Sequence, residues 1–148
     1  MTERTRGYAH RIDVKRPVSA VWAALTTPAA LREWWSPGAE IDARPGGSVR
    51  ASVDRVTQFV AHIDVCLPER RLRLIHLPSQ ELPSQDCTLV DDIVLEAGAQ
   101  AAIVRLLGSG VPGARGWDML YLRMRRGWEQ TLARLKVYVE RDGVQGVR

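Results

Sequence analysis

Hydrophobic and polar residues alternate along the start of the chain. One face of this stretch carries Tyr8, His10, Ile12 and Val14. The opposite face is mostly charged, and a period of two residues predicts a half-buried β-strand. Pro17 then opens a helical segment over 18–26, and a threonine followed by Pro28 opens a second one over 29–35. We therefore expect one strand followed by two short helices.

The middle of the chain predicts a series of antiparallel strands. Two proline–glycine breaks divide residues 36–50 into a loop, a short strand and a turn. The strand-like runs that follow lie at 57–67, 70–77, 87–96 and 101–110. Their connections are too short for the crossovers that parallel strands need, so we expect an antiparallel meander.

Alternation within two of these runs assigns side chains to faces. The first run places on one face Phe59, Ala61, Ile63, Val65 and Leu67. In the second run, His76 shares its face with Leu72 and Leu74. A histidine on an apolar face is usually a satisfied buried or edge residue, and it can also serve as a general base or bind a ligand. The same alternatives hold for His10, whereas His62 is expected to face solvent.

A helical period dominates the C-terminal part of the chain, from about 116 to 141. Its apolar stripe consists of Trp117, Leu120, Tyr121, Met124, Trp128, Leu132, Leu135, Tyr138 and Val139. Thr131 is the only polar member of this stripe, which is wide enough to lie along a sheet. Gly127 lies at its edge, although a glycine inside a helix costs roughly 1 kcal/mol relative to alanine. We expect the missing side chain to leave a concave space beside Trp128.

The order of these elements resembles the helix-grip fold of the START, polyketide-cyclase and birch-pollen-allergen superfamily. Within it, the chain is similar to homologues of the activator of the heat-shock-protein ATPase. The residues that carry this similarity are Pro17, Val21, Trp22, Trp34, Trp35, Pro37, Gly46, Gly47, Pro68, Gly127 and Trp128. It covers about residues 8–141.

The resemblance implies an α+β domain in which a curved antiparallel sheet of about six or seven strands wraps around a long C-terminal helix. Two short helices follow the first strand, and an apolar cavity lies between the sheet and the long helix. Superfamily members bind lipids, hormones or polyketides, and some catalyse cyclisation or hydrolysis. We expect residues 1–148 to form a single domain of this kind, with its core within 8–141.

Two stretches depart from the family's pattern. Many relatives end the last strand with threonine, histidine, serine and glycine, whereas this chain has Leu-Leu-Gly-Ser-Gly at 106–110. No residue here can therefore take a role that the family gives to that histidine. The loop at 78–86 is long and contains prolines, so we expect it to alter the mouth of the cavity.

Composition places the chain among globular proteins. Hydrophobic residues make up 45% and charged residues 26% of the 148 residues. No apolar run approaches the roughly 18 residues of a membrane-spanning helix, and the start lacks the apolar region of a signal peptide. We therefore expect a cytoplasmic protein without a membrane partner, and we expect Cys66 and Cys87 to remain reduced thiols.

The net charge of +4 permits an acidic partner but does not by itself indicate nucleic acid. Between Arg115 and Arg141 there are seven basic residues and three acidic ones, and most of them lie off the apolar stripe. These basic residues form the side of the helix opposite the apolar stripe, called here the basic back of the helix. A solvated face is the first interpretation of this side, and a surface that binds an acidic protein is the second. No aromatic residues interleave with it, so no nucleic-acid partner is expected.

Several kinds of chemistry find little support in the sequence. The three histidines and two cysteines lack the close spacing of zinc ligands, so no metal is expected. Asp91 and Asp92 are neighbours on one predicted strand, point to opposite faces, and cannot act together as an acid–base pair. Ser109 is expected in a glycine-rich turn without a nearby histidine. No cofactor is expected.

The first functional hypothesis is binding of a small, largely apolar molecule between the long helix and the sheet. The residues expected to line its site are Trp35, Phe59, His76, Tyr121, Met124 and Trp128. Tryptophans would supply flat surface, and Tyr121 or His76 a polar anchor.

Two other functions remain open at this point. One is a cyclase- or hydrolase-type enzyme that uses the same cavity with His76 as base. The sequence shows no second polar residue converging on His76, which counts against it. The other is a co-chaperone-like interaction module that uses the basic back of the helix, and a homodimer is also compatible with the sequence.

Overall fold

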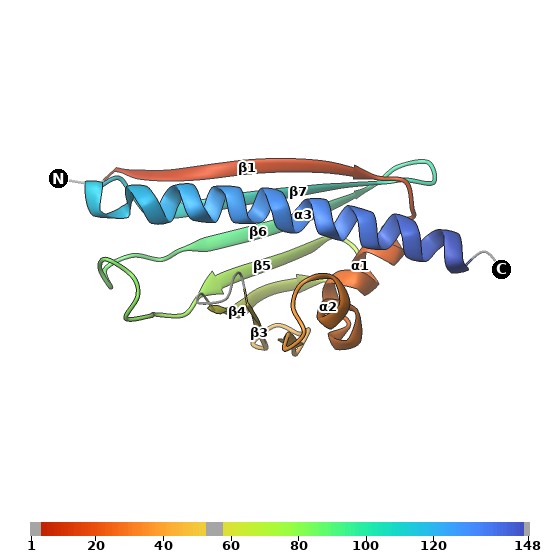
Figure 1. Ribbon diagram of the computed structural model, residues 1–148, viewed down its shortest axis with the longest axis horizontal. Coiled ribbons are helices and arrows are strands. Elements are labelled where there is room, and N and C mark those ends of the chain that lie inside the picture. Colours follow the sequence, from red (N-terminus) through yellow and green to blue (C-terminus); the bar gives the residue numbers. More distant parts are fainter. Residues whose placement is uncertain (1–3, 53–57, 147–148) are drawn as a thin grey trace.

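The computed structural model describes residues 4–52 and 58–146 of the chain (Figure 1). Its strands are β1 (Thr5–Val14), β2 (Glu40–Ile41), β3 (Ser48–Ser52), β4 (Gln58–Leu67), β5 (Arg71–His76), β6 (Val90–Ala97) and β7 (Ala102–Pro112). Its helices are α1 (Val18–Thr26), α2 (Pro28–Trp34), the short 3-10 helix η1 (Arg115–Trp117) and α3 (Asp118–Gly146).

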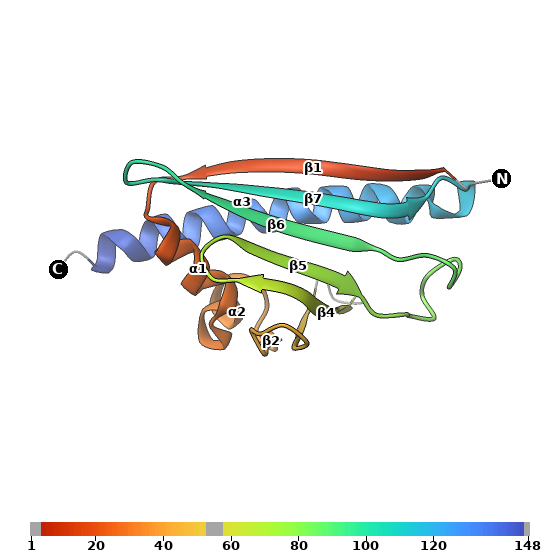
Figure 2. The ribbon, with the colours of Figure 1, turned by 180° about the vertical axis from the view of Figure 1, so that it is seen from behind.

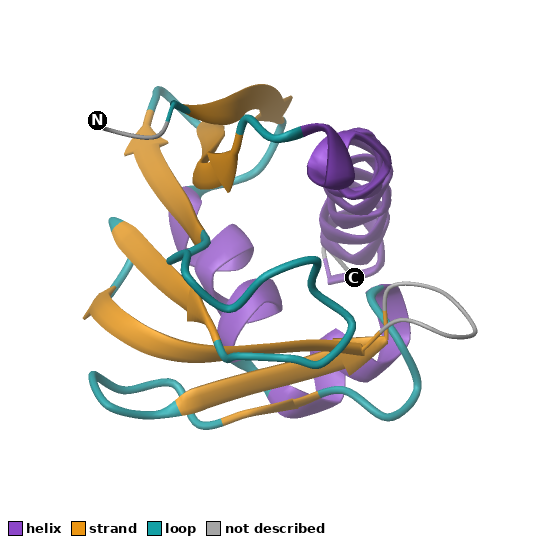
Figure 3. Cartoon of the chain, turned by 90° about the vertical axis from the view of Figure 1, so that its left-hand side faces the viewer, coloured by secondary structure: helices purple, strands orange, loops and turns teal. Residues whose placement is uncertain are grey.

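The strands form one antiparallel sheet in the order β1-β7-β6-β5-β4-β3-β2. Figure 3 shows the sheet curling around α3, which runs along its concave side. The two short helices α1 and α2 lie at the end of the sheet near the C-terminus (Figure 1). The predicted α+β helix-grip fold, with seven strands and a long C-terminal helix, is confirmed.

The core lies between the concave face of the sheet and α3. Alternate residues of each long strand are buried there, as the period of two predicts. On the middle strands these are Phe59, Ala61, Ile63, Leu72, Leu74, Asp91, Ile93, Leu95, Val104 and Leu106. On α3 the buried residues are Trp128, Thr131, Leu132, Leu135 and Val139. The apolar stripe predicted for this helix is therefore confirmed.

The register of β4 corrects one assignment of faces. Pairing with β5 shifts between Ile63 and Val65, so Asp64 is an extra residue in β4. Beyond this bulge Cys66 turns inward and packs against the core, whereas Leu67 is 48% exposed. The prediction that Val65 and Leu67 share the inner face with Phe59 is wrong, because the bulge reverses the alternation. Thr57, the first residue of that predicted strand, lies outside the described residues.

Two neighbouring strands, β1 and β7, also differ in extent from the prediction. β1 begins at Thr5, three residues before the predicted alternation, because it pairs with β7 as far as Pro112. β7 in turn continues through the stretch that was expected to form a turn. Ser109 therefore lies in a strand and pairs with Val90 of β6.

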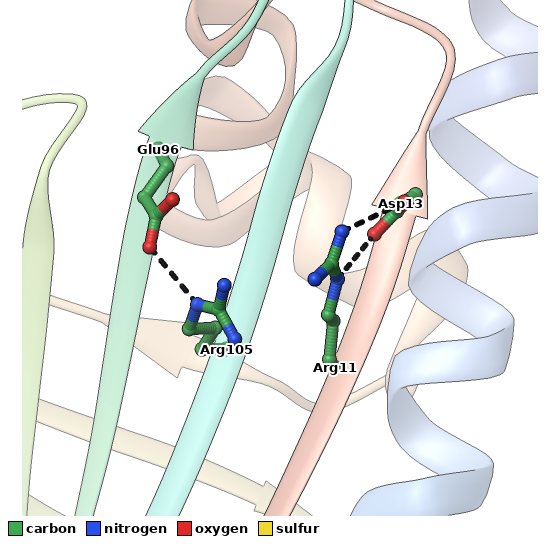
Figure 4. A network of polar contacts seen from close by, with 4 residues as sticks. All are labelled: Arg11, Asp13, Glu96 and Arg105. Carbon is green, nitrogen blue, oxygen red and sulfur yellow. Dashed lines mark hydrogen bonds and ion pairs between the residues drawn. The ribbon is translucent and has the colours of Figure 1, made fainter.

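In Figure 2 the strands lie in front of α3, and no described helix covers the outer face of the sheet. Arg11 pairs with Asp13 along β1 at 2.8 Å, and Arg105 of β7 reaches Glu96 of β6 at 2.9 Å (Figure 4). Ion pairs with this exposure contribute little to stability. These exposed ion pairs are typical of a surface in contact with water. The cavity described below lies on the inner face of the sheet. Among the described residues, no helix has the length and apolarity needed to cross a membrane.

Candidate functional site

A partly open cavity of about 370 Å³ lies between the first half of α3 and the inner face of β4 and β5. The loop 77–89, which connects β5 to β6, borders its mouth. The lining residues from the sheet and α2 side are Trp35, Gln58, Phe59, Val60, His76 and Leu89. Those from α3 are Leu120, Arg123, Met124, Gly127, Trp128 and Thr131.

The spacing on α3 explains why this half of the helix borders a cavity. Its lining positions recur every three or four residues, so they lie on one helical face. Gly127 lies in the middle of this face and offers no side chain to fill the space. Thr131, the only polar member of the apolar stripe, is buried at the edge of the cavity. The expected concave space beside Trp128 is present.

Aromatic side chains form the floor of the cavity. The Trp35 ring lies 5.4 Å from Phe59 and 5.6 Å from Trp128, and the last two rings meet edge to face at 5.7 Å, all measured between ring centroids. Such offset and perpendicular contacts are the favourable geometries for aromatic pairs. The floor is therefore rigid and apolar.

The two adjacent tryptophans of α2 and its C-terminal end have different roles. The Trp34 indole stacks on Trp35 at 5.6 Å and donates its N–H to the Ala24 carbonyl oxygen at 2.9 Å. The Nε1 of Trp35 is buried and has no hydrogen-bond acceptor among the residues that the structure describes. A buried donor without a partner costs about 1–3 kcal/mol. Trp35 thus contributes ring surface to the cavity, whereas its Nε1 has almost no accessible surface.

A chain of polar contacts crosses the inner face of the sheet and ends at the cavity. The Tyr8 hydroxyl of β1 donates to Oδ1 of Asp91 on β6 at 2.5 Å. Oδ2 of Asp91 lies 2.5 Å from Nε2 of His76 on β5. The Asp91 side chain is fully buried, whereas 16% of the His76 side chain is exposed. Of these three residues, only His76 lines the cavity.

A glycine lets Tyr8 reach across the intervening strand. Gly108 of β7 is the cross-strand partner of both Tyr8 and Asp91. A Cβ on Gly108 would lie 2.2 Å from Cζ of Tyr8, so no side chain fits at this position. The tyrosine ring passes over the bare backbone of β7 to reach the carboxyl group. The Leu-Leu-Gly-Ser-Gly stretch that departs from the family's pattern is therefore the crossing point of the polar chain.

The electrostatics fix the direction of the hydrogen bonds. Burial, and then the negative charge of Asp91, raise the pKa of the Tyr8 hydroxyl far above its ordinary value, with a contact to Trp128 acting in the opposite direction. The Tyr8 hydroxyl therefore stays protonated and donates a hydrogen bond to Asp91. With Asp91 as acceptor, Nε2 of His76 is the donor of the second hydrogen bond. Nδ1 makes no hydrogen bond to any described residue.

The sequence matches a family described as activator of Hsp90 ATPase homolog 1-like protein over residues 15–140. The chain belongs to this family. Its expected similarity to the heat-shock-protein ATPase activator branch is thereby confirmed. A comparison with curated proteins gave no match.

Solved structures of members and relatives share the fold of this activator-homologue chain. Protein MLL2253 from Mesorhizobium loti superimposes with a TM-score of 0.79 at 20% identity, over 92% of this chain and 98% of that one. The Aha1 dimer from Colwellia psychrerythraea gives 0.71 at 19% identity, over 91% and 96%. DynU16, from the dynemicin biosynthetic locus, gives 0.69 at 23% identity, over 90% of this chain and 47% of its own. At these identities the likeness concerns the fold alone.

The structure of this activator homologue brings together most of the residues expected at the site. The cavity is lined by Trp35, Phe59, His76, Met124 and Trp128. Tyr121 lies elsewhere, because its hydroxyl donates to the Gly7 carbonyl oxygen at 2.7 Å and its ring lies against Tyr8 and the Arg6 guanidinium. His10 is also outside the cavity, with its Nε2 at 2.8 Å from the Arg125 carbonyl oxygen.

Sequence reasoning missed Tyr8 and Asp91 as partners of His76. The expectation that no second polar residue converges on His76 is wrong. Asp91 could have been found, because it alternates with Leu89 and Ile93, both buried, so the pattern marks it as an inward carboxyl. Tyr8 could not, because its reach depends on the pairing of β1 with β7. Within the described residues, no group of three metal-ligating side chains occurs.

Proposed function

We propose that the chain binds a small, planar, largely apolar molecule in the cavity between α3 and the sheet. The observation that carries this proposal is a space of about 370 Å³ with a floor of three aromatic rings. This volume lies at the lower end of the range for small-molecule sites, which are mostly apolar with a few placed polar groups. A fused two-ring or three-ring compound has the matching size.

The polar groups restrict the ligand further. Gln58 and Thr131 line the cavity with polar side chains, so a ligand oxygen or nitrogen is favoured near them. His76 borders the cavity beside Phe59, so a ligand hydroxyl or acidic C–H is favoured there. Arg123 and Glu81 border the mouth with opposite charges. DynU16 comes from a natural-product biosynthetic locus, and its shared fold is compatible with such a ligand.

Gly127→Leu tests this proposal, because it places a side chain into the cavity wall while removing a helix-weakening glycine. We expect naphthol, as a planar aromatic alcohol, to bind the native protein and to quench tryptophan fluorescence. In Gly127→Leu its Kd should rise by more than about tenfold, which corresponds to about 1.4 kcal/mol. The free energy of unfolding should not fall, since leucine is about 1 kcal/mol better than glycine in a helix.

Gln130→Leu is the matched control, because Gln130 is an exposed residue on the same helix. It should leave naphthol binding unchanged. The proposal fails if a panel of planar aromatic alcohols, ketones and acids shows no binding by calorimetry, or if Gly127→Leu binds them as tightly as the native chain.

A second candidate function is interaction with an acidic protein through the outer side of α3. Arg125, Arg126 and Arg134 are exposed there, and the matched family is described as homologous to an ATPase activator. The solved Aha1 protein from Colwellia psychrerythraea is a dimer, which also favours self-association as a property of such chains.

The double variant Arg125→Glu/Arg126→Glu tests this second candidate. We expect it to lose more than about tenfold in affinity for an acidic chaperone partner, with binding of the native chain weakening as salt is raised. Arg50→Glu/Arg70→Glu changes the charge equally at exposed sites away from α3 and should have no such effect. A binding assay at low salt that recovers neither a chaperone nor a dimer of the native chain counts against it.

A further inference from the structure

We propose that the cavity is also a proton-transfer site, in which His76 acts as a general base towards an acidic C–H or O–H group of a planar apolar substrate. Asp91 and Tyr8 act as positioning residues. The proposal rests on the proposed function, because the substrate must enter the same cavity. It adds a reaction to binding.

His76 is the member of the polar chain that borders the cavity. Asp91 is fully buried and both of its oxygens are engaged, so it offers nothing to a ligand. His76 stands between this carboxyl group and the cavity, with Nε2 turned to Asp91 and Nδ1 without a partner among the described residues. The ring therefore presents to the cavity a nitrogen that can accept a proton.

Asp91 holds the His76 ring in place through its contact with Nε2. A carboxyl group bonded to one imidazole nitrogen fixes the tautomer and the ring orientation, and it stabilises the positive charge that develops when the other nitrogen takes a proton. The Tyr8 hydroxyl holds Oδ1, so the Asp91 side chain cannot rotate away from His76. The edge of the Phe59 ring meets His76 at 4.9 Å between centroids and limits ring rotation on the cavity side. Such a fixed base is what general-base catalysis requires.

The aromatic floor sets the shape of the substrate. Phe59 contacts both His76 and Trp35, with centroid distances of 4.9 Å and 5.4 Å. A planar ring that stacks over this floor can hold its acidic C–H towards His76. The substrate class is thus a planar aromatic compound with a C–H or O–H acidified by a nearby carbonyl or heteroatom.

Nitrobenzisoxazole is a probe that isolates this step, because its ring opening needs only a base. His76 Nδ1 takes the proton from the ring carbon, the C–H electron pair forms the carbon–nitrogen triple bond, and the nitrogen–oxygen bond breaks. The oxygen leaves with that electron pair as a coloured cyanonitrophenolate. The proton on His76 then passes to solvent through the open mouth, so no further reactant is required.

We expect the native chain to open nitrobenzisoxazole with saturation kinetics and His76→Gln to lose about a hundredfold or more in kcat, the usual share of a general base. Asp91→Asn keeps the shape and an acceptor for Tyr8, and should lower kcat about tenfold while KM stays within about twofold. Asp92→Asn makes the same change on the opposite face of β6, where Asp92 binds Arg71. It should leave both constants unchanged, as should His62→Gln at the exposed His62 of β4.

Chemical rescue separates a base from a merely structural residue. His76→Ala should regain ring-opening activity when imidazole is added, with a rate that saturates as imidazole fills the vacated space. A native rate no higher than that of His76→Gln overturns the proton-transfer proposal, and so does the absence of imidazole rescue. If naphthol still binds in that case, the proposed function stands alone. If naphthol does not bind and Gly127→Leu opens the probe as fast as the native chain, both proposals fail.

Discussion

Gly108→Ala is expected to lower the free energy of unfolding by about 3 kcal/mol, at the upper end of the cost of overpacking a core. The added methyl group would lie 2.2 Å from Cζ of Tyr8 and 2.3 Å from the neighbouring ring carbon. Tyr8 is buried, and it lies across the β7 backbone at Gly108. To accommodate the methyl group, its ring must move and its hydrogen bond to the buried Asp91 must break. Urea unfolding followed by tryptophan fluorescence measures the loss.

Two further variants show whether the tyrosine is the cause. Gly38→Ala places a methyl group where no atom lies within 4 Å, so its effect should stay within about 0.5 kcal/mol. In a Tyr8→Ala background, Gly108→Ala should cost less than about 1 kcal/mol, because the obstructing ring is gone. An undiminished cost in that background would mean that the backbone of β7, and not Tyr8, rejects the side chain.

Secondary structure and fold class could be predicted from the sequence because their signals are local. A period of two marks β1 and β5, and a period close to four marks the stripe of α3 from Trp117 to Val139. The bulge at Asp64 carries no such signal, because an extra residue in β4 becomes visible only in its pairing with β5. The faces of Val65 and Leu67 could therefore not be assigned correctly from alternation alone.

The aromatic part of the candidate site could also be anticipated, whereas its polar part could not. Trp35, Phe59 and Trp128 are large apolar residues at inward positions, and such residues meet wherever a helix covers a sheet. The contact of Tyr8 with Asp91 depends on three strands in register and on a glycine between them. Sequence reasoning correctly placed Asp91 and Asp92 on opposite faces. Alternation within one strand does not indicate which inward polar group of another strand reaches Asp91 across the sheet.

The polar chain and the cavity depend on the same departure from uniform packing. Gly108 carries no side chain where the Tyr8 ring lies across it, and Gly127 lines the cavity without a side chain. At Gly108 the Tyr8 ring occupies the space of a side chain, so the core there is closely packed. At Gly127 this space belongs to the cavity, so the first half of α3 borders a cavity and the second half packs against the core.

Leu135→Ala is expected to lower the free energy of unfolding by about 3 kcal/mol, whereas Met124→Ala should cost less than about 1 kcal/mol. Leu135 is fully buried in the second half of α3, so its truncation leaves a new cavity among closely packed neighbours. Met124 borders a space that already exists, and its truncated atoms give up fewer contacts. Urea unfolding of both variants under identical conditions measures the difference.

Leu122→Ala provides the reference for an exposed leucine on the same helix, since 53% of Leu122 is exposed. Its effect should stay within about 0.5 kcal/mol. Equal costs for Met124→Ala and Leu135→Ala would show that the first half of α3 is as tightly packed as the second in solution. The space that a planar ligand needs over Phe59 would then be absent, and His76 would face side chains in place of a substrate. A clear difference between the two variants instead requires that the cavity persists without a ligand.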